Sequence, residues 1–315
     1  TSGVGYFADT TSLAFTITLP ASPSAGNVVA VSDYAGTFAT NALTIGRNSS
    51  NINGSASDFI LNKNNVTAQF IYVDATQGWR VVFTGDQSGS GLSEAFITAT
   101  GGTITTCGND KIHTFTGPGT FAVSQIAECS ANNLVSYTVV AGGGGCGSGG
   151  VGGGGGAGGY RETKSPVTPY TASPLDGYST PGNRITVTAT GFPITVGGGG
   201  AKCTAGGNSV FSTITSAGGG KGGLRNAGST GGSGGGGGHE HGGSAGNTPP
   251  VTPPQGNAGG AGINSSPIYP AGGGGGAAEA GNTDAQGQGG DGVASSINAS
   301  AVTRSGGGGG GVNDC

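Results

Sequence analysis

The residues with the most distinctive chemistry are two histidines separated by one residue, in the segment His239-Glu240-His241. Alternate residues of an extended strand point to the same face, so both imidazoles could bind one metal ion. Structural and catalytic zinc sites use three or four protein ligands, and no third ligand lies nearby in the sequence. We therefore favour a solvated loop tip here, and expect neither a metal nor a cofactor.

No motif in the sequence supports a catalytic function. The sequence has no phosphate-binding loop of the GKS or GKT type. His113, like the other two histidines, has no recognisable serine or cysteine partner, and carboxylates such as Asp284 and Asp291 have no pocket that the sequence predicts. We expect the protein to be non-catalytic.

The cysteines raise the question of disulfides. Because their number is odd, at least one is unpaired within the chain. Cys107 and Cys129 flank two expected strands joined at Gly117-Pro118-Gly119, so a disulfide that closes this unit and buried free thiols both fit the sequence. No CxxC or CxxH spacing predicts a zinc site. The cysteines are Cys107, Cys129, Cys146, Cys203 and Cys315, of which the first four are the candidates for disulfides.

Candidate binding residues lie in polar inserts between runs of glycine. Tyrosine and arginine on exposed loops suit contacts with carbohydrate or protein surfaces, because a rigid amphipathic ring offers contact area at little cost in conformational entropy. The alternative is that the tyrosines pack back onto the glycine segments and fill the space that glycine leaves empty. The candidates are Tyr160, Arg161, Tyr170, Tyr178, His239, His241 and Tyr269.

The glycine runs must position these inserts. All but 15 of the 74 glycines lie beyond residue 141. Glycine loses more backbone entropy on ordering than any other residue, so such tracts form either disordered linkers or structures that only glycine permits. Pure runs that alternate with strand-like segments favour packed polyproline-II-type helices, which have about three residues per turn and no internal hydrogen bonds. Without a Cβ, neighbouring helices can approach closely enough to satisfy each other's backbone groups.

Shorter alternating patterns dominate the front of the chain. One strand is expected at 13–19, with Leu13, Phe15, Ile17 and Leu19 on a single face. Several such short runs, separated by Gly, Asn and Ser, predict a small antiparallel β-sandwich or β-prism. No window has helical periodicity, so we expect very little helix.

The predicted fold is therefore all-β. Residues 1–84 form a β-rich module, 85–93 a linker, 94–141 a β-strand entry to the glycine-rich domain, and 142–315 the glycine-rich domain with its loop inserts. That last domain is expected to consist of packed polyglycine-II-type helices laced with β-strands.

Composition narrows the class of partner. Only 8% of residues are charged and the net charge is −4, with no stripe of lysine and arginine, so nucleic acid is not expected as a partner. No apolar run of about 20 residues predicts membrane insertion. The chain starts at Thr1 without a signal-peptide pattern. We therefore expect a fragment or a processed product.

Several segments carry a likeness to known proteins, and they include Tyr72-Val-Asp-Ala-Thr-Gln-Gly-Trp79, His113-Thr-Phe-Thr-Gly-Pro-Gly-Thr120 and Asn208-Ser-Val-Phe-Ser-Thr-Ile214. The front half resembles modules in tail-fibre and virion structural proteins of marine and cyanobacterial phages, over residues 15–79. The back half resembles glycine-rich-domain proteins of such phages, and more distantly the tip adhesins of T-even-type phages, whose glycine-rich segments pack as polyglycine-II helices.

This resemblance implies an extracellular component of a virion tail fibre. Its partners would be a bacterial surface receptor, either a polysaccharide or an outer-membrane protein, and other tail-fibre proteins. Fibres of this kind are commonly homotrimers, although no coiled-coil heptad in this chain argues for one. The alternatives are a purely structural connector or filament subunit and, least favoured, a polysaccharide depolymerase.

Overall fold

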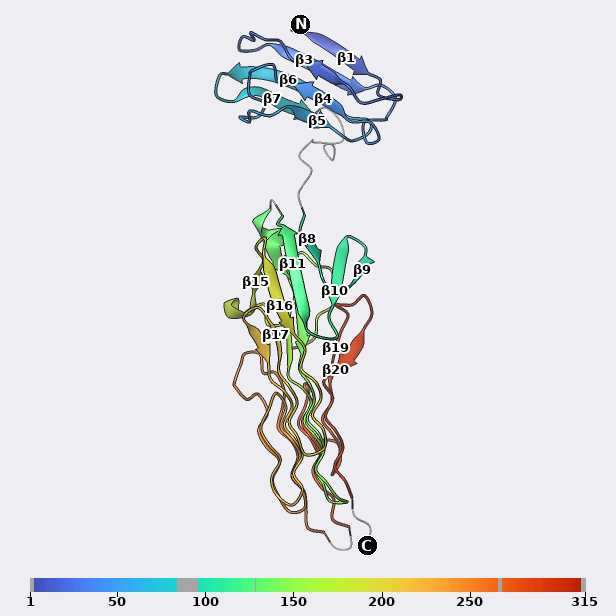
Figure 1. Cartoon of the computed structure of the whole chain (residues 1–315), viewed down its shortest axis with the longest axis vertical. Coiled ribbons are helices and arrows are strands. Elements are labelled where there is room, and N and C mark those ends of the chain that lie inside the picture. The colour runs from blue at the N-terminus through green and yellow to red at the C-terminus, as the bar shows by residue number, and fades with distance from the viewer. Residues whose placement is uncertain (1–2, 84–95, 128, 266–267, 313–315) are drawn as a thin grey trace. The chain divides into compact units, whose positions relative to one another are not determined.

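The computed structural model describes residues 3–83, 96–127, 129–265 and 268–312 (Figure 1). The chain divides into two compact units, Thr1–Glu94 and Ala95–Cys315. The division falls at the end of the predicted linker, whose residues 85–93 lie outside the described ranges.

The first unit consists of two small sheets with one core between them. In each sheet the first two strands of the order given below pair in parallel, and the other neighbours are antiparallel. Phe38, Phe70 and Trp79 are fully buried in the shared core. One sheet has the order β1 (Val4–Ala8), β3 (Val28–Asp33), β6 (Thr67–Asp74), β7 (Gly78–Phe83), and the other β2 (Thr16–Thr18), β4 (Leu43–Gly46), β5 (Phe59–Leu61).

The strand predicted at 13–19 is shorter than expected. Only Thr16–Thr18 pairs with β4, so Leu13 lies ahead of the sheet and is 63% exposed. Leu19, at the other end, is buried in the core. The alternation therefore did reflect a strand, but its first apolar residue has no core to face.

The second unit begins with a five-stranded sheet in the order β18-β17-β16-β11-β8. Edge-to-face contacts among Phe121, Tyr137 and Phe211 stabilise its core. The bounds are β8 (Thr98–Thr100), β11 (Gly119–Gln125), β16 (Gly191–Thr195), β17 (Ser209–Phe211) and β18 (Ile214–Ser216).

The second unit also contains four two-stranded sheets, all antiparallel. They are β9 (Thr103–Cys107) with β10 (Asp110–Thr114), β12 (Leu134–Val135) with β15 (Ile185–Thr186), β13 (Tyr137–Val140) with β14 (Tyr160–Thr163), and β19 (Val293–Ser295) with β20 (Val302–Arg304).

Helix is almost absent from the described residues, which contain only the 3-10 turns η2 (Ser130–Asn133) and η3 (Pro181–Asn183). The all-β prediction is confirmed. Within the same residues no helix has the length and apolar character needed to cross a bilayer.

The glycine runs form a bundle of extended segments, which lies below the strands of the second unit in Figure 1. Their hydrogen bonds join different segments and recur with a period of three residues, so every third residue faces the same neighbour. A threefold helix without internal hydrogen bonds is the geometry of polyglycine II. One such row of donors and acceptors is Gly153 to Gly223, Gly156 to Gly220 and Gly159 to Ala217, with N to O distances of 2.7, 2.8 and 2.8 Å.

The packing of this bundle requires bare backbone. A Cβ on Gly155 would lie 2.0 Å from the carbonyl oxygen of Gly144, and one on Gly154 would lie 2.0 Å from that of Gly308. Real Cβ atoms essentially never come within 3.0 Å of a neighbour. The glycines are therefore needed for close approach, which confirms the predicted packed bundle.

Candidate binding site

The first insert does not present its leading residues to solvent. Tyr160 is 1% exposed and Arg161 is 7% exposed. They lie in β14, which pairs with β13 on one side, while the Tyr160 nitrogen donates to the Gln255 carbonyl on the other. The structure therefore does not support a receptor contact for Tyr160 and Arg161, and the alternative of packing onto the glycine bundle describes them better.

A buried carboxylate anchors this insert. One oxygen of Glu162 accepts hydrogen bonds from the Tyr160 hydroxyl at 2.8 Å and the Ser173 backbone nitrogen at 2.9 Å, and the other accepts from the Ser295 hydroxyl at 2.6 Å. Glu162 is 2% exposed. Three donors on a buried carboxylate join β14, the insert and β19, so this group has a structural role.

Burial also changes the acidity of the neighbouring phenols. It raises the pKa of Tyr160 to about 12, and the negative charge of Glu162 adds to that effect. Burial likewise raises the pKa of Tyr170, again with a contribution from Glu162. Both hydroxyls stay protonated well into the alkaline range, because a phenolate would have to lose its hydration beside a carboxylate.

Tyr170 and Tyr178 are only half-buried. The Lys164 ammonium lies 6.0 Å from the Tyr170 ring centroid, and the Arg184 guanidinium lies 4.4 Å from that of Tyr178. Arg184 also donates from Nε to the Tyr178 carbonyl at 2.8 Å. These cation–π contacts hold both rings against their own insert.

The later inserts meet at the turns that close the glycine bundle. Val151, Arg225, His239 and Tyr269 line a cavity of about 320 Å³. The His239 and Tyr269 ring centroids are 5.2 Å apart. The structure thus brings together two of the predicted residues, His239 and Tyr269, whereas His241 is exposed and does not line the cavity.

Backbone hydrogen bonds fix the walls of this cavity. The His239 nitrogen donates to the Val151 carbonyl at 3.3 Å, and the Gly238 nitrogen donates to the Asn226 carbonyl at 3.1 Å. The Ile263 nitrogen donates to the Pro270 carbonyl at 3.0 Å and so closes the turn that carries Tyr269. The first two bonds join the turns at Val151, Arg225 and His239, and the Gly262 nitrogen, which donates to the His241 carbonyl at 2.9 Å, joins the turn that carries Tyr269 to them.

Sequence reasoning missed Arg225. It is an isolated cation at a turn after a glycine segment, where the Leu224 nitrogen donates to the Asn226 side chain at 3.0 Å. The available signal was that a charged residue between glycine segments must project from the bundle, because the bundle has no room for side chains.

The two histidines do not meet a third ligand side chain in the described part of the chain. His239 Nδ1 lies 3.7 Å from Glu240 Oε1, and neither His239 nor His241 belongs to a group of three converging ligand side chains. The favoured description of a solvated loop tip fits His241.

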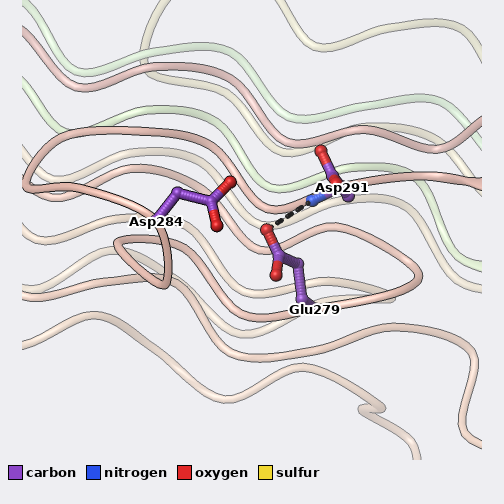
Figure 2. Close-up of side chains that lie close together, drawn as sticks. All are labelled: Glu279, Asp284 and Asp291. Carbon is purple, nitrogen blue, oxygen red and sulfur yellow. Dashed lines mark hydrogen bonds between the residues drawn. The ribbon is translucent and has the colours of Figure 1, made fainter.

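Three carboxylates do converge elsewhere, in Glu279, Asp284 and Asp291, which each place one oxygen within 4.8 Å of the others. Figure 2 shows the Glu279 carboxylate reaching the Asp291 backbone nitrogen, at 3.3 Å. The Asp284 and Asp291 side chains are exposed and Glu279 is half-buried. Exposed acidic groups are common without an ion, so we assign no metal to this patch.

The described cysteines carry free thiols, so the disulfide considered for Cys107 and Cys129 is not formed in the structure. Both of these side chains are exposed, which also excludes buried thiols. The Cys203 nitrogen donates to the Cys146 carbonyl at 2.9 Å, so these two residues lie on neighbouring segments. Cys315 lies outside the described ranges.

Comparison with known proteins shows which family the glycine bundle resembles. A family model described as a glycine-rich domain matches residues 114–314, which is more than half of the chain. No curated protein matches the sequence.

Proposed function

The chain belongs to the glycine-rich domain family, and from this premise we propose that it is a distal phage tail-fibre protein that attaches the virion to a bacterial cell surface. In this role it is non-catalytic. Its receptor is a surface polysaccharide or an outer-membrane protein, and it assembles with other tail-fibre proteins, as a homotrimer, outside the cell.

One observation carries this proposal: Arg225, His239 and Tyr269, from three separate inserts, line one cavity at turns that close the bundle. Packed glycine segments have no side chains with which to recognise anything, and a Cβ within them would collide with neighbouring carbonyls. Binding residues concentrate in loops held by a rigid scaffold. The cavity at Arg225, His239 and Tyr269 has this arrangement.

The alternative function, a structural connector without receptor contact, is favoured by a different feature. Large apolar side chains are exposed on the first unit, where Phe7 is 78%, Tyr34 68% and Leu13 63% exposed. Exposed apolar side chains that lie side by side often mark contacts with other proteins. The Tyr34 nitrogen donates to the Ala8 carbonyl at 3.0 Å, which places Tyr34 beside the strand that carries Phe7. These residues suit attachment to the rest of a fibre, under either function.

Adsorption to cells tests the proposal. Fluorescently labelled protein is applied to a panel of marine bacteria and cyanobacteria, beside a variant in which residues 224–226 and 239–241 are replaced by Gly-Ser-Gly. Binding to some strains that the variant loses, with unchanged melting temperature, is the expected result. Equal binding by both proteins would contradict it.

Imaging of the assembled particle separates the two functions. A receptor-binding protein lies at a free tip, whereas a connector lies between other proteins. Incubation with polysaccharides from a bound strain tests the non-catalytic prediction, and new reducing ends would show a depolymerase instead.

A further inference from the structure

We propose that the cavity lined by Val151, Arg225, His239 and Tyr269 binds a sugar unit that carries a carboxylate, as found in acidic bacterial polysaccharides. This inference names the ligand class of the receptor-binding site and rests on the proposed function. The cavity is the starting point, since it joins a cation and two rings at turns on a stiff scaffold.

Arg225 supplies the charge. It is exposed and has no hydrogen bond or ion pair within the described ranges, and no acidic side chain lines the cavity. The Glu240 carboxylate does not line the cavity, and its Oε1 lies 3.7 Å from His239 Nδ1. A guanidinium presents a planar fork of donors that matches a carboxylate in a bidentate manner, so an anionic ligand group is favoured over a neutral one.

The two rings supply the apolar contact. His239 and Tyr269 are half-buried, with their planes inclined by 38°. Rings with an apolar body and a polar edge can contact the C–H face of a sugar while they hydrogen-bond its hydroxyl groups. Val151 adds a further apolar wall.

The size of the cavity favours a small ligand group over a flat protein surface. A volume of about 320 Å³ lies at the lower end of the range of ligand pockets, which is about 300–1,000 Å³. The turns around it are joined by backbone hydrogen bonds at His239 and Gly238. Such preorganisation lowers the entropic cost of ordering loops when a ligand binds.

Matched oligosaccharides test the charge. Binding of the full chain to β-1,4-mannuronate tetrasaccharide is measured by calorimetry at low salt, beside β-1,4-mannotetraose, which has hydroxymethyl groups in place of the carboxylates. A second matched pair is β-1,4-glucuronate tetrasaccharide and cellotetraose. We expect at least one acidic sugar to bind about tenfold or more tighter than its neutral partner, because hydrogen bonds between charged groups are the stronger ones.

Variants assign this preference to the cavity. Arg225→Gln should remove the difference between acidic and neutral sugars, and Tyr269→Ala should weaken binding of both. Lys202→Gln removes the same charge from another exposed site of this unit and should leave the preference intact. Unchanged melting temperatures show that the variants fold.

Three results would overturn the inference: equal affinity within both pairs, no binding of any of the four sugars, or a preference that survives Arg225→Gln. Failure of the proposed function gives a different pattern. A protein that adsorbs to cells but binds none of the four sugars has a receptor-binding role without this ligand. One that prefers the acidic sugars but adsorbs to no strain has the site without the role.

Discussion

The replacement of a single interior glycine tests the close packing of the bundle. Gly155 is buried, and a Cβ on it would lie 2.0 Å from the Gly144 carbonyl oxygen, whereas real contacts begin near 3.0 Å. Gly155→Ala must therefore move two segments apart by roughly an ångström. The hydrogen bond that joins these two segments, from the Gly144 nitrogen to the Gly156 carbonyl at 2.8 Å, is placed at risk by that movement.

The cost follows from two effects. Overpacking a close-packed interior costs about 1–3 kcal/mol, and each buried backbone group left unpaired costs about 1–3 kcal/mol. Alanine also lowers the conformational entropy of the unfolded chain relative to glycine, which offsets about 0.4–1 kcal/mol of this loss. We expect a net loss of about 3 kcal/mol, which lowers the melting temperature of a unit of this size by roughly 6–12 °C.

Gly198→Ala provides the matched control. Gly198 is exposed and has no positive φ, and no atom lies within 4 Å of the position that a Cβ on it would take. Only the effect on the unfolded chain then remains, and stability should rise by about 0.4–1 kcal/mol. Scanning calorimetry of both variants measures the two shifts. Similar melting temperatures for Gly155→Ala and Gly198→Ala would refute the reasoning that carbonyl contacts make the interior glycines necessary.

Three further results are expected. The pKa of Tyr160 is about 12 in the folded state and about 10 in an unfolded chain. The contribution of the protonated hydroxyl to stability is therefore complete below about pH 10 and is lost as the pH rises to about 12. Chemical denaturation between about pH 10 and 12 should show a falling free energy of unfolding, and a flat profile would contradict this. Glu162→Gln turns a buried acceptor of three hydrogen bonds partly into a donor, so it should lower the free energy of unfolding by about 1–3 kcal/mol. Glu240→Gln alters only an exposed pair and should lower it by about 0–1 kcal/mol in the same denaturation assay. Oxidised glutathione should form a disulfide between Cys146 and Cys203, whose backbones are linked by a hydrogen bond of 2.9 Å. Each thiol loses one proton and one electron, and the reagent is reduced to two molecules of glutathione. Peptide mapping that finds other disulfide pairs instead would count against this.

The bundle could be predicted from the sequence because its cause is local. A pure run of glycines lacks every Cβ, and only close packing of bare backbone gives such a run an ordered structure. The runs at 152–156 and 272–276 are hydrogen-bonded neighbours, through the Gly154 nitrogen and the Gly272 carbonyl at 2.9 Å. Which run lies beside which depends on the connections between them, and the sequence pattern does not determine that order.

The candidate site was predicted less well because its causes are distant. Tyr160 and Arg161 have the composition of an exposed loop, yet β13 and the segment at Gln255 cover them. His239 and Tyr269 were predicted individually. Their meeting with Arg225 depends on three turns that the bundle brings together, and no local pattern encodes that convergence.

Hydrogen exchange of the glycine amides tests the central claim most directly, that bare backbone forms a stiff scaffold for its turns. We expect slow exchange at Gly153, Gly156 and Gly159, whose amides donate to the neighbouring segment at 2.7–2.8 Å, and faster exchange in the turn around Arg225. Exchange at the rate of an unstructured chain throughout residues 142–311 would contradict the account.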